Sequence, residues 1–79
     1  MTDRPTVPDV LPLVNAVYRR NPLGCCLRIL TDDGNVEKYH AAFCVDQARE
    51  SGHTDCLQAA EMLAKMTRTQ RLQVYRRHD

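Results

Sequence analysis

Two histidines and two cysteines in the middle of the chain are residue types that commonly bind zinc. They form two closely spaced pairs, His40 with Cys44 and His53 with Cys56. If these pairs faced each other across a helical hairpin, four N and S ligands could surround a tetrahedral ion. Structural zinc sites usually place two cysteines at short spacing, however, and free cysteine is a common small core residue. Core cysteines beside a half-buried histidine are therefore the favoured interpretation.

Other residue sets that could catalyse a reaction are incomplete. Cys25 and Cys26 are adjacent, so they point apart on a helix or a strand and cannot bind one metal ion well together. The sequence has no Cys-x-x-Cys redox pair. No signature indicates a cysteine nucleophile with its base and oxyanion hole. The run DDGN that starts at Asp32 begins like a calcium loop, but its twelfth position is Phe43, where glutamate is required. We expect a turn there, no enzymatic activity and no cofactor.

Charge is unevenly distributed along the chain. Residues 1–30 have a net charge of +2, residues 31–61 of −5 and residues 62–79 of +4. The acidic and basic parts could pair inside the molecule, or form a two-signed surface that steers a charged partner. The candidate partner contacts are Arg19, Arg20, Arg68, Arg71, Arg76 and Arg77. These arginines could dock on an acidic protein surface or, in the last helix, contact nucleic-acid phosphates.

The tetrapeptide VYRR occurs twice, at residues 17–20 and 74–77. Each copy falls in the last turn of a predicted helix. Arginines there complement the negative end of the helix dipole, worth about 0.3–1 kcal/mol each. The Val and Tyr of each copy would be the last inward-facing residues. Helix-end chemistry therefore explains the repeat without a ligand, and four residues are too few to indicate a structural repeat.

Length and composition predict one small domain. The chain has 79 residues, of which 43% are hydrophobic and 5% aromatic, and its net charge is +1. A chain this short buries roughly 60% of its extended surface, which leaves no room for a buried cofactor site. No 18-residue apolar run could span a membrane, and the N-terminus lacks the apolar segment of a secretory signal. We expect a cytoplasmic protein whose cysteines are thiols.

Apolar residues recur at helical spacing and predict an all-α domain of four or five short helices. We expect a flexible N-terminal arm at residues 1–8 and a single helical domain at residues 9–79. The expected helices cover residues 9–20, 23–30, 36–51, 54–66 and 67–77. The second stretch also alternates like a strand. The absence of a second strand favours a helix, although a strand here could pair with a strand of a second copy in a dimer.

Capping residues and apolar faces place the ends and the buried sides of these helices. The predicted N-caps are Asp9, Asn21, Asp33 or Asn35, Thr54 and Thr67. Gln70 would complete a capping box with the last of them, and Gly52 would end the third helix in the left-handed conformation. The predicted inward residues are Val10, Leu13, Val14, Val17 and Tyr18, then Cys56, Ala59, Ala60, Leu63 and Met66, then Leu72 and Tyr75.

The predicted third and fourth helices have the outline of a DNA-binding helix-turn-helix. In the register of that motif, Gln58 and Glu61 would occupy apolar positions of the second helix. That helix also carries Asp55, and its carboxylates would be repelled by phosphate. We therefore reject DNA reading by this hairpin.

The run GCCLRILTDDGN at residues 24–35 resembles the core of a family of small uncharacterised proteins carried by phages and prophages. That core reads roughly Gly-Gly-x-Leu-His-Ile-x-x-Asp-Asp-Gly-Asn. Later features also match, namely Cys44, the pair AR at residues 48–49, and the run MTRTQR at residues 66–71. The similarity covers residues 18–77. Cys25 and Arg28 depart from the glycine and histidine of the family.

The resemblance implies an accessory protein of a phage or mobile element that acts in the cytoplasm of the host cell. Phage proteins of this size include counter-defence proteins, which bind host complexes rather than catalyse reactions. We therefore expect a non-enzymatic, protein-binding inhibitor. The concrete hypothesis is an anti-CRISPR protein that blocks a multi-subunit CRISPR effector complex. The alternative is a small zinc-stabilised or nonspecific nucleic-acid-binding module, and the oligomeric state stays open.

Overall fold

The computed structural model describes residues 5–20, 27–31 and 37–77. These residues form five α-helices and no strand, which confirms the predicted all-α fold. The helices are α1 (Val7–Arg20), α2 (Leu27–Thr31), α3 (Lys38–Ser51), α4 (Thr54–Lys65) and α5 (Arg68–Arg77). Residues 27–31 are thus helical, whereas the first half of the predicted 23–30 helix lies outside the described residues.

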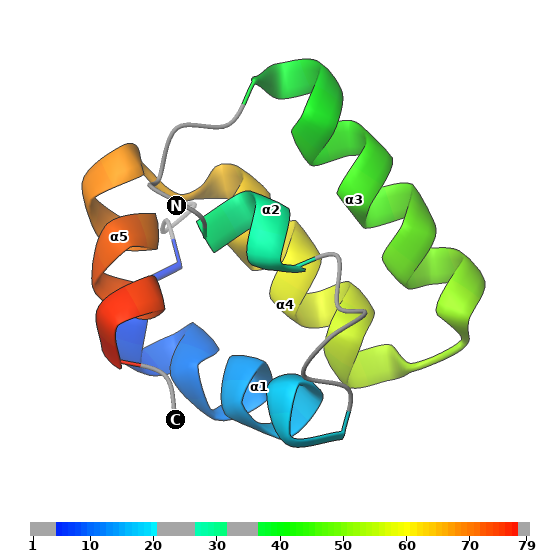
Figure 1. Cartoon of the computed structure of the whole chain (residues 1–79), viewed down its shortest axis with the longest axis horizontal. Helices are drawn as coiled ribbons and strands as arrows, with labels where there is room; N and C mark the ends of the chain where they lie inside the picture. The colour runs from blue at the N-terminus through cyan, green and yellow to red at the C-terminus, as the bar shows by residue number, and fades with distance from the viewer. Residues whose placement is uncertain (1–4, 21–26, 32–36, 78–79) are drawn as a thin grey trace.

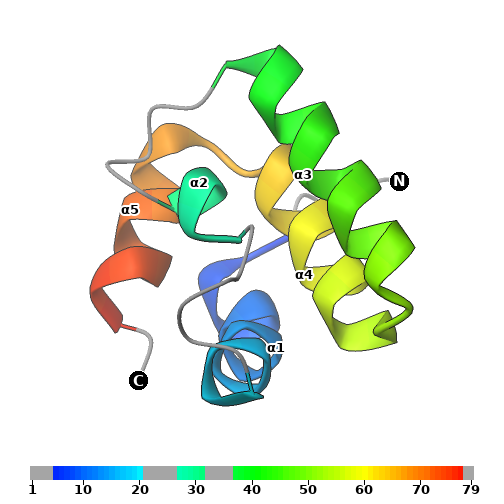
Figure 2. The same cartoon turned by 45° about the vertical axis from the view of Figure 1, so that its right-hand side comes forward.

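Helix α4 lies in the middle of the molecule and packs against α1, α2 and α3. Helix α1 also packs on α5, and the short α2 contacts both α3 and α5. Two views show α3 and α5 on opposite sides of the molecule, with α2 and α4 between them (Figures 1 and 2). The radius of gyration is 11.1 Å. Because a folded chain of this length should have a value of about 11.6 Å, the helices form one compact body.

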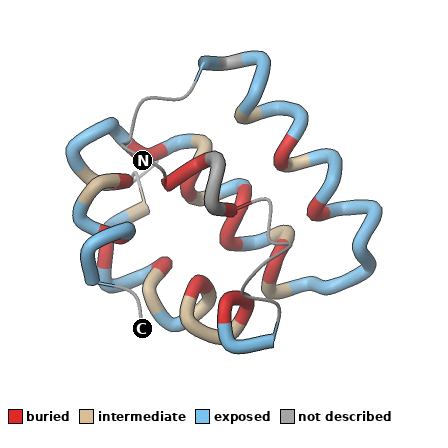
Figure 3. The backbone as a smooth tube through the Cα atoms, in the orientation of Figure 1, coloured by how far each residue is buried: buried red, intermediate tan, exposed pale blue. Residues whose placement is uncertain are grey.

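The core lies where the inner sides of the helices meet around α4 (Figure 3). The predicted apolar sides of α1 and α4 are confirmed, although Leu13 is only partly buried. α2 contributes Leu27 and Leu30, and α3 contributes the small residues Cys44 and Ala48. The small side chains on α3 leave its large aromatic residues outside the core.

A buried hydroxyl pair ties α1 to α2. The Tyr18 hydroxyl lies 3.0 Å from Oγ1 of Thr31, and both residues are buried. The Thr31 hydroxyl donates to the carbonyl oxygen of Leu27 at 3.1 Å. Because that bond uses the Thr31 proton, the Tyr18 hydroxyl is the donor of the pair. The first VYRR copy therefore places its tyrosine in the core, as predicted.

Helix α1 begins at Val7, so the predicted start with Asp9 as its N-cap was wrong. Thr6 is the cap, because its carbonyl oxygen accepts from the N–H of Asp9 and Val10. The Asp9 carboxylate accepts from the Thr6 hydroxyl at 2.7 Å and from its N–H at 3.2 Å, and these bonds lower the pKa of Asp9. Val7 is buried, whereas residues 1–4 of the predicted arm lie outside the described residues.

The earlier helix start also changes the position of Pro12. With the predicted Asp9 cap, this proline would have been in the first turn, where a missing N–H has no consequence. It instead lies inside α1, beyond the first turn. A proline there cannot donate the helical hydrogen bond to the carbonyl four residues earlier.

Most of the other helix ends agree with the predicted capping residues, and two N-caps differ from the prediction. Gly52 has φ of 79° and ends α3, as predicted. The capping box before α5 is confirmed, since Thr67 N–H donates to Gln70 Oε1 at 2.9 Å and Gln70 N–H to Thr67 Oγ1 at 3.2 Å. His53, rather than Thr54, is the N-cap of α4. Glu37 is the N-cap of α3, whereas residues 21, 33 and 35 lie outside the described residues.

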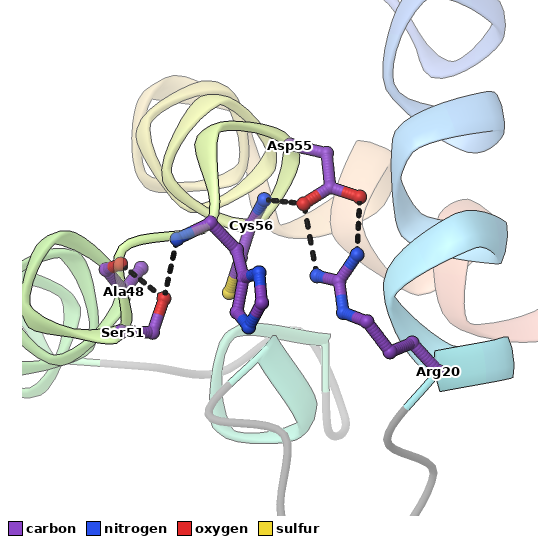
Figure 4. Close-up of polar contacts among 6 residues, drawn as sticks. Arg20, Ala48, Ser51, Asp55 and Cys56 are labelled. Atoms are coloured by element: carbon purple, nitrogen blue, oxygen red, sulfur yellow. Dashed lines mark hydrogen bonds and ion pairs between the residues drawn. The ribbon is translucent and has the colours of Figure 1, made fainter.

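Side-chain bonds also shape the turn between α3 and α4 (Figure 4). The Ser51 hydroxyl donates to the carbonyl oxygen of Ala48 at 2.6 Å. The same hydroxyl oxygen accepts from the N–H of His53 at 3.2 Å. Together with the left-handed Gly52, these bonds define how the chain leaves α3 and enters α4.

The buried side of α5 differs from the prediction. We expected Leu72 and Tyr75 to face inward, but Arg71 and Val74 are the buried residues and Tyr75 is 40% exposed. The reason is that Arg71 has hydrogen-bond acceptors inside the molecule, as described below. With Arg71 and Val74 inward, Tyr75 is left at the edge of the buried side, so the second VYRR copy does not reproduce the buried tyrosine of the first.

Candidate functional site

Arg71, one of the six candidate contacts, lies inside the molecule with only 8% of its surface exposed. Its Nη1 donates to the carbonyl oxygens of Leu63 at 3.2 Å and Met66 at 2.8 Å, at the C-terminal end of α4. The last carbonyls of a helix have no partner within that helix, so a cation there satisfies them and complements the helix dipole. Burial lowers the pKa of the Arg71 guanidinium. Arg71 thus joins α5 to α4 and is not a surface contact.

Arg20 is also engaged within the chain. Its two terminal nitrogens donate to the two carboxylate oxygens of Asp55 at 2.8 and 2.9 Å, as Figure 4 shows. The Asp55 carboxylate accepts a third bond from the N–H of Cys56 at 2.7 Å. The bonds from Arg20 are the main cause that lowers the pKa of Asp55. The ion pair fastens the end of α1 to the start of α4.

Four candidate arginines remain on the surface: Arg19, Arg68, Arg76 and Arg77. Within the part of the chain that the structure describes, none of them forms an ion pair, since the pairs found are Arg20–Asp55 and Arg49–Asp46. Arg19 lies at the end of α1, whereas the other three belong to α5. Figure 1 shows the C-terminal end of α5 at the lower left and the C-terminal end of α1 at the opposite end of the α1 helix, at the lower right. The two VYRR copies therefore do not form one site.

The exposed side of α5 carries a group of arginines that we call the basic surface of α5: Arg68, Arg76 and Arg77. α5 contains no acidic residue. Its opposite side is fixed by the buried residues Arg71 and Val74. The basic surface therefore belongs to a helix that is anchored on its inner side and positively charged on its outer side.

A second exposed surface lies on α3 and was not predicted from the sequence. Tyr39 is 74% and Phe43 49% exposed, and Asp46 and Glu50 are exposed as well. These four residues, which we call the aromatic–acidic stripe of α3, follow the 4-3-4 spacing of one helix side. That side is opposite the buried Cys44 and Ala48. The signal in the sequence was a pair of aromatic residues one turn apart, out of phase with the small residues of the same helix.

Contacts within α3 organise the two ends of this stripe. The Tyr39 ring meets the His40 ring edge to face, with centroids 5.5 Å apart. Arg49 Nη1 donates to the Asp46 carboxylate at 2.9 Å, on the exposed surface. A shallow hollow of about 430 Å³ is lined by Phe43, Asp46, Gln47, Arg49 and Glu50. An aromatic ring and carboxylates thus share one accessible hollow.

The four proposed zinc ligands do not assemble. His40 and His53 are exposed, whereas Cys44 and Cys56 are buried. No group of three or more His, Cys, Asp or Glu side chains among the described residues is placed to hold a metal ion. Cys44 faces the core, where burial raises the pKa of its thiol. The core interpretation of Cys44 and Cys56 is confirmed by their burial, but the expectation of a half-buried histidine beside them was wrong, since His40 is exposed. Cys25 and Cys26 lie outside the described residues.

No family model, curated protein or solved structure gave a significant match to this chain. A search of the described helices found none with the length and apolar character needed to cross a membrane. The two candidate binding sites of the molecule are therefore its two exposed surfaces, the basic surface of α5 and the aromatic–acidic stripe of α3.

Proposed function

We propose that this protein is a non-enzymatic binding protein that docks on an acidic surface of another protein through the basic surface of α5. The observation that carries the proposal is the exposure of Arg68, Arg76 and Arg77 on a helix without acidic residues. No described carboxylate lies within ion-pair distance of these arginines. Arginine is enriched at binding hot spots because its planar guanidinium binds carboxylates with two parallel hydrogen bonds.

The inner side of α5 supports this role by holding the helix in place. Its first turn is closed by the Thr67–Gln70 capping box, and Arg71 bonds the end of α4. Gln70 also donates from Nε2 to the carbonyl oxygen of Pro5 at 3.2 Å. A surface presented by an anchored helix has less conformational entropy to lose on binding.

The resemblance to phage and prophage proteins extends the proposal to the identity of the partner. We propose that the partner is a host protein complex in the cytoplasm and that binding inhibits it. A CRISPR effector complex is the first candidate, because acidic surfaces of such a complex and the phosphates of the nucleic acid that it holds would both attract arginines. If this candidate is right, the protein is an anti-CRISPR inhibitor that covers a surface of the effector complex and catalyses no reaction.

The proposal is tested by affinity purification of the tagged protein from a CRISPR-bearing bacterial lysate treated with nuclease. The binding variant is Arg76→Glu/Arg77→Glu. The control is Arg19→Glu/Lys65→Glu, which changes net charge equally at exposed positions outside α5. We expect effector subunits in stoichiometric amounts with the wild type and the control, and their loss with the α5 variant. Equal recovery with the α5 variant would contradict the proposal.

The same arginines favour nucleic-acid binding as the second candidate function. Three phosphate contacts would make the affinity for duplex DNA fall with salt, with a logarithmic slope of about −2.7. So few contacts give weak binding, which is why we prefer a protein partner. Binding of a short duplex with that slope, lost in Arg76→Glu/Arg77→Glu, would support the second candidate; no binding at low salt would remove it.

A further inference from the structure

We propose that this chain associates with itself head to tail. In this arrangement, the aromatic–acidic stripe of α3 in one copy docks against the basic surface of α5 in a second copy. The inference is independent of the host partner proposed above, because both contacting surfaces belong to this chain. It assigns the stripe of α3 a role that the arginine-based function does not use.

The aromatic residues of the stripe are exposed to solvent. Most surface helices turn their large apolar residues toward the core. Helix α3 does the reverse, since it packs through the small residues Cys44 and Ala48 and leaves Tyr39 and Phe43 in solvent. Adjacent exposed aromatic rings are characteristic of surfaces that bind another protein.

The residue types of the stripe favour contact with a surface that carries arginines. Its aromatic rings attract cations through their π faces, with arginine the commonest partner. Its carboxylates, above all Glu50, for which the structure shows no ion pair in its described part, accept hydrogen bonds from guanidinium groups. An arginine-rich helix surface meets both requirements, and the basic surface of α5 is one.

α3 and α5 lie on opposite sides of the molecule, so the stripe and the basic surface cannot meet within one chain (Figures 1 and 2). Two different surfaces that bind each other form a heterologous contact, which leaves a free surface at each end and allows further copies to add. The expected product is therefore a series of oligomers rather than a closed dimer.

The expected strength follows from the size and polarity of the contact. One helix side of 14 residues spans about 21 Å. A single such contact buries less than the roughly 800 Å² per partner of a standard interface, so the association should be weak and reversible. Because exposed charges form part of it, added salt should weaken it. The small net charge of +1 opposes association only slightly.

The test uses sedimentation velocity on two variants that each lose one surface, namely Arg76→Glu/Arg77→Glu on α5 and Tyr39→Ala/Glu50→Gln on α3. We expect the wild type to grow in mass with concentration at low salt, and each variant alone to stay monomeric. An equimolar mixture should form a dimer of twice the monomer mass and no larger species, because one intact stripe and one intact basic surface remain. Circular dichroism checks that both variants are folded.

Matched controls keep the test specific. Arg19→Glu/Lys65→Glu and Glu61→Lys alter exposed charges outside both surfaces and should associate like the wild type. A wild type that stays monomeric at low salt would overturn the inference, and so would a monomeric mixture of the two variants. Association of the α5 variant alone would show a symmetric contact instead. None of these results bears on recovery of a host complex, so the proposed function would stand or fall separately.

Discussion

The guanidinium of Arg71 lies against the end of helix α4 and donates to the carbonyl oxygen of Met66 at 2.8 Å. This contact assigns Arg71 to the interior and leaves the other α5 arginines for the surface. It also sets the rotation of α5, because the buried Arg71 and Val74 determine which residues face outward. The basic surface therefore depends on a structural arginine that is not part of it.

Arg71→Met should destabilise the fold by about 1–3 kcal/mol, because carbonyls at the end of α4 lose a charged hydrogen-bond donor while an unbranched apolar stem is kept. Arg68→Met removes an exposed arginine from the same helix and should change stability by less than about 0.5 kcal/mol. Urea unfolding of both variants measures the difference. Equal stabilities would show that the Arg71 bonds contribute nothing.

The Arg20–Asp55 pair predicts acid sensitivity. The pKa of Asp55 is lowered in the folded state, mainly by the hydrogen bonds from Arg20. Its stabilising contribution is therefore complete above the unfolded value of about 3.9 and is lost as pH falls through the folded pKa. A double-mutant cycle with Arg20→Ala and Asp55→Asn should give a coupling of about 0.5–1 kcal/mol at pH 7, since the pair is partly exposed.

The same coupling should decrease as pH falls from 7 to 2, because protonation of the Asp55 carboxyl removes the charge that pairs with Arg20. Some acid sensitivity should persist in Asp55→Asn, because the pKa of Asp9 is lowered too. A coupling that does not change between the two pH values would contradict the assignment of the pair.

The capping box before α5 can be tested with two threonines of the same segment. Thr67→Ala removes the hydroxyl that accepts from the Gln70 N–H, and should cost about 1 kcal/mol. Thr69→Ala changes an exposed position inside α5 and should leave stability equal or slightly higher, because alanine favours helix. Thermal melts followed by circular dichroism compare them. A larger loss from Thr69→Ala would be inconsistent with the cap.

Burial of Cys44 predicts that its thiol is protected. The thiolate is the reactive form, and burial both raises the pKa of Cys44 and blocks access to it. Iodoacetamide should modify Cys44 far more slowly in the folded protein than in urea, with peptide mass spectrometry as the readout. Modification of the folded protein at the rate seen in urea would argue against the core position.

Local and periodic features of the fold were predictable from the sequence. The buried side of α4 follows from the spacing of Cys56, Ala59, Ala60 and Leu63, and the left-handed stop follows from Gly52. The capping box of α5 also lies within four residues. Each of these depends on neighbours in the chain, so a pattern in one segment is enough to predict it.

Features that depend on contacts between distant segments were missed. Periodicity treats arginine as a surface residue, so it could not place Arg71 against carbonyls of α4, and the predicted inward side of α5 was wrong. The partner of Arg20 lies 35 residues away in the chain. The exposure of Tyr39 and Phe43 depends on which side of α3 packs on α4, and the small residues that decide this carry a weak hydrophobic signal.

The most direct test of the central claim, that α5 presents a protein-binding surface, is photo-crosslinking in a CRISPR-bearing cell from a benzophenone residue at Gln73. This exposed position of α5 lies one helical turn before Arg76 and Arg77, and the exposed Gln58 of α4 is the control position. We predict an adduct with a host protein from Gln73 that disappears when Arg76→Glu/Arg77→Glu is added, and little adduct from Gln58. Equal adducts from both positions, or an adduct from Gln73 that survives the charge reversal, would contradict the claim.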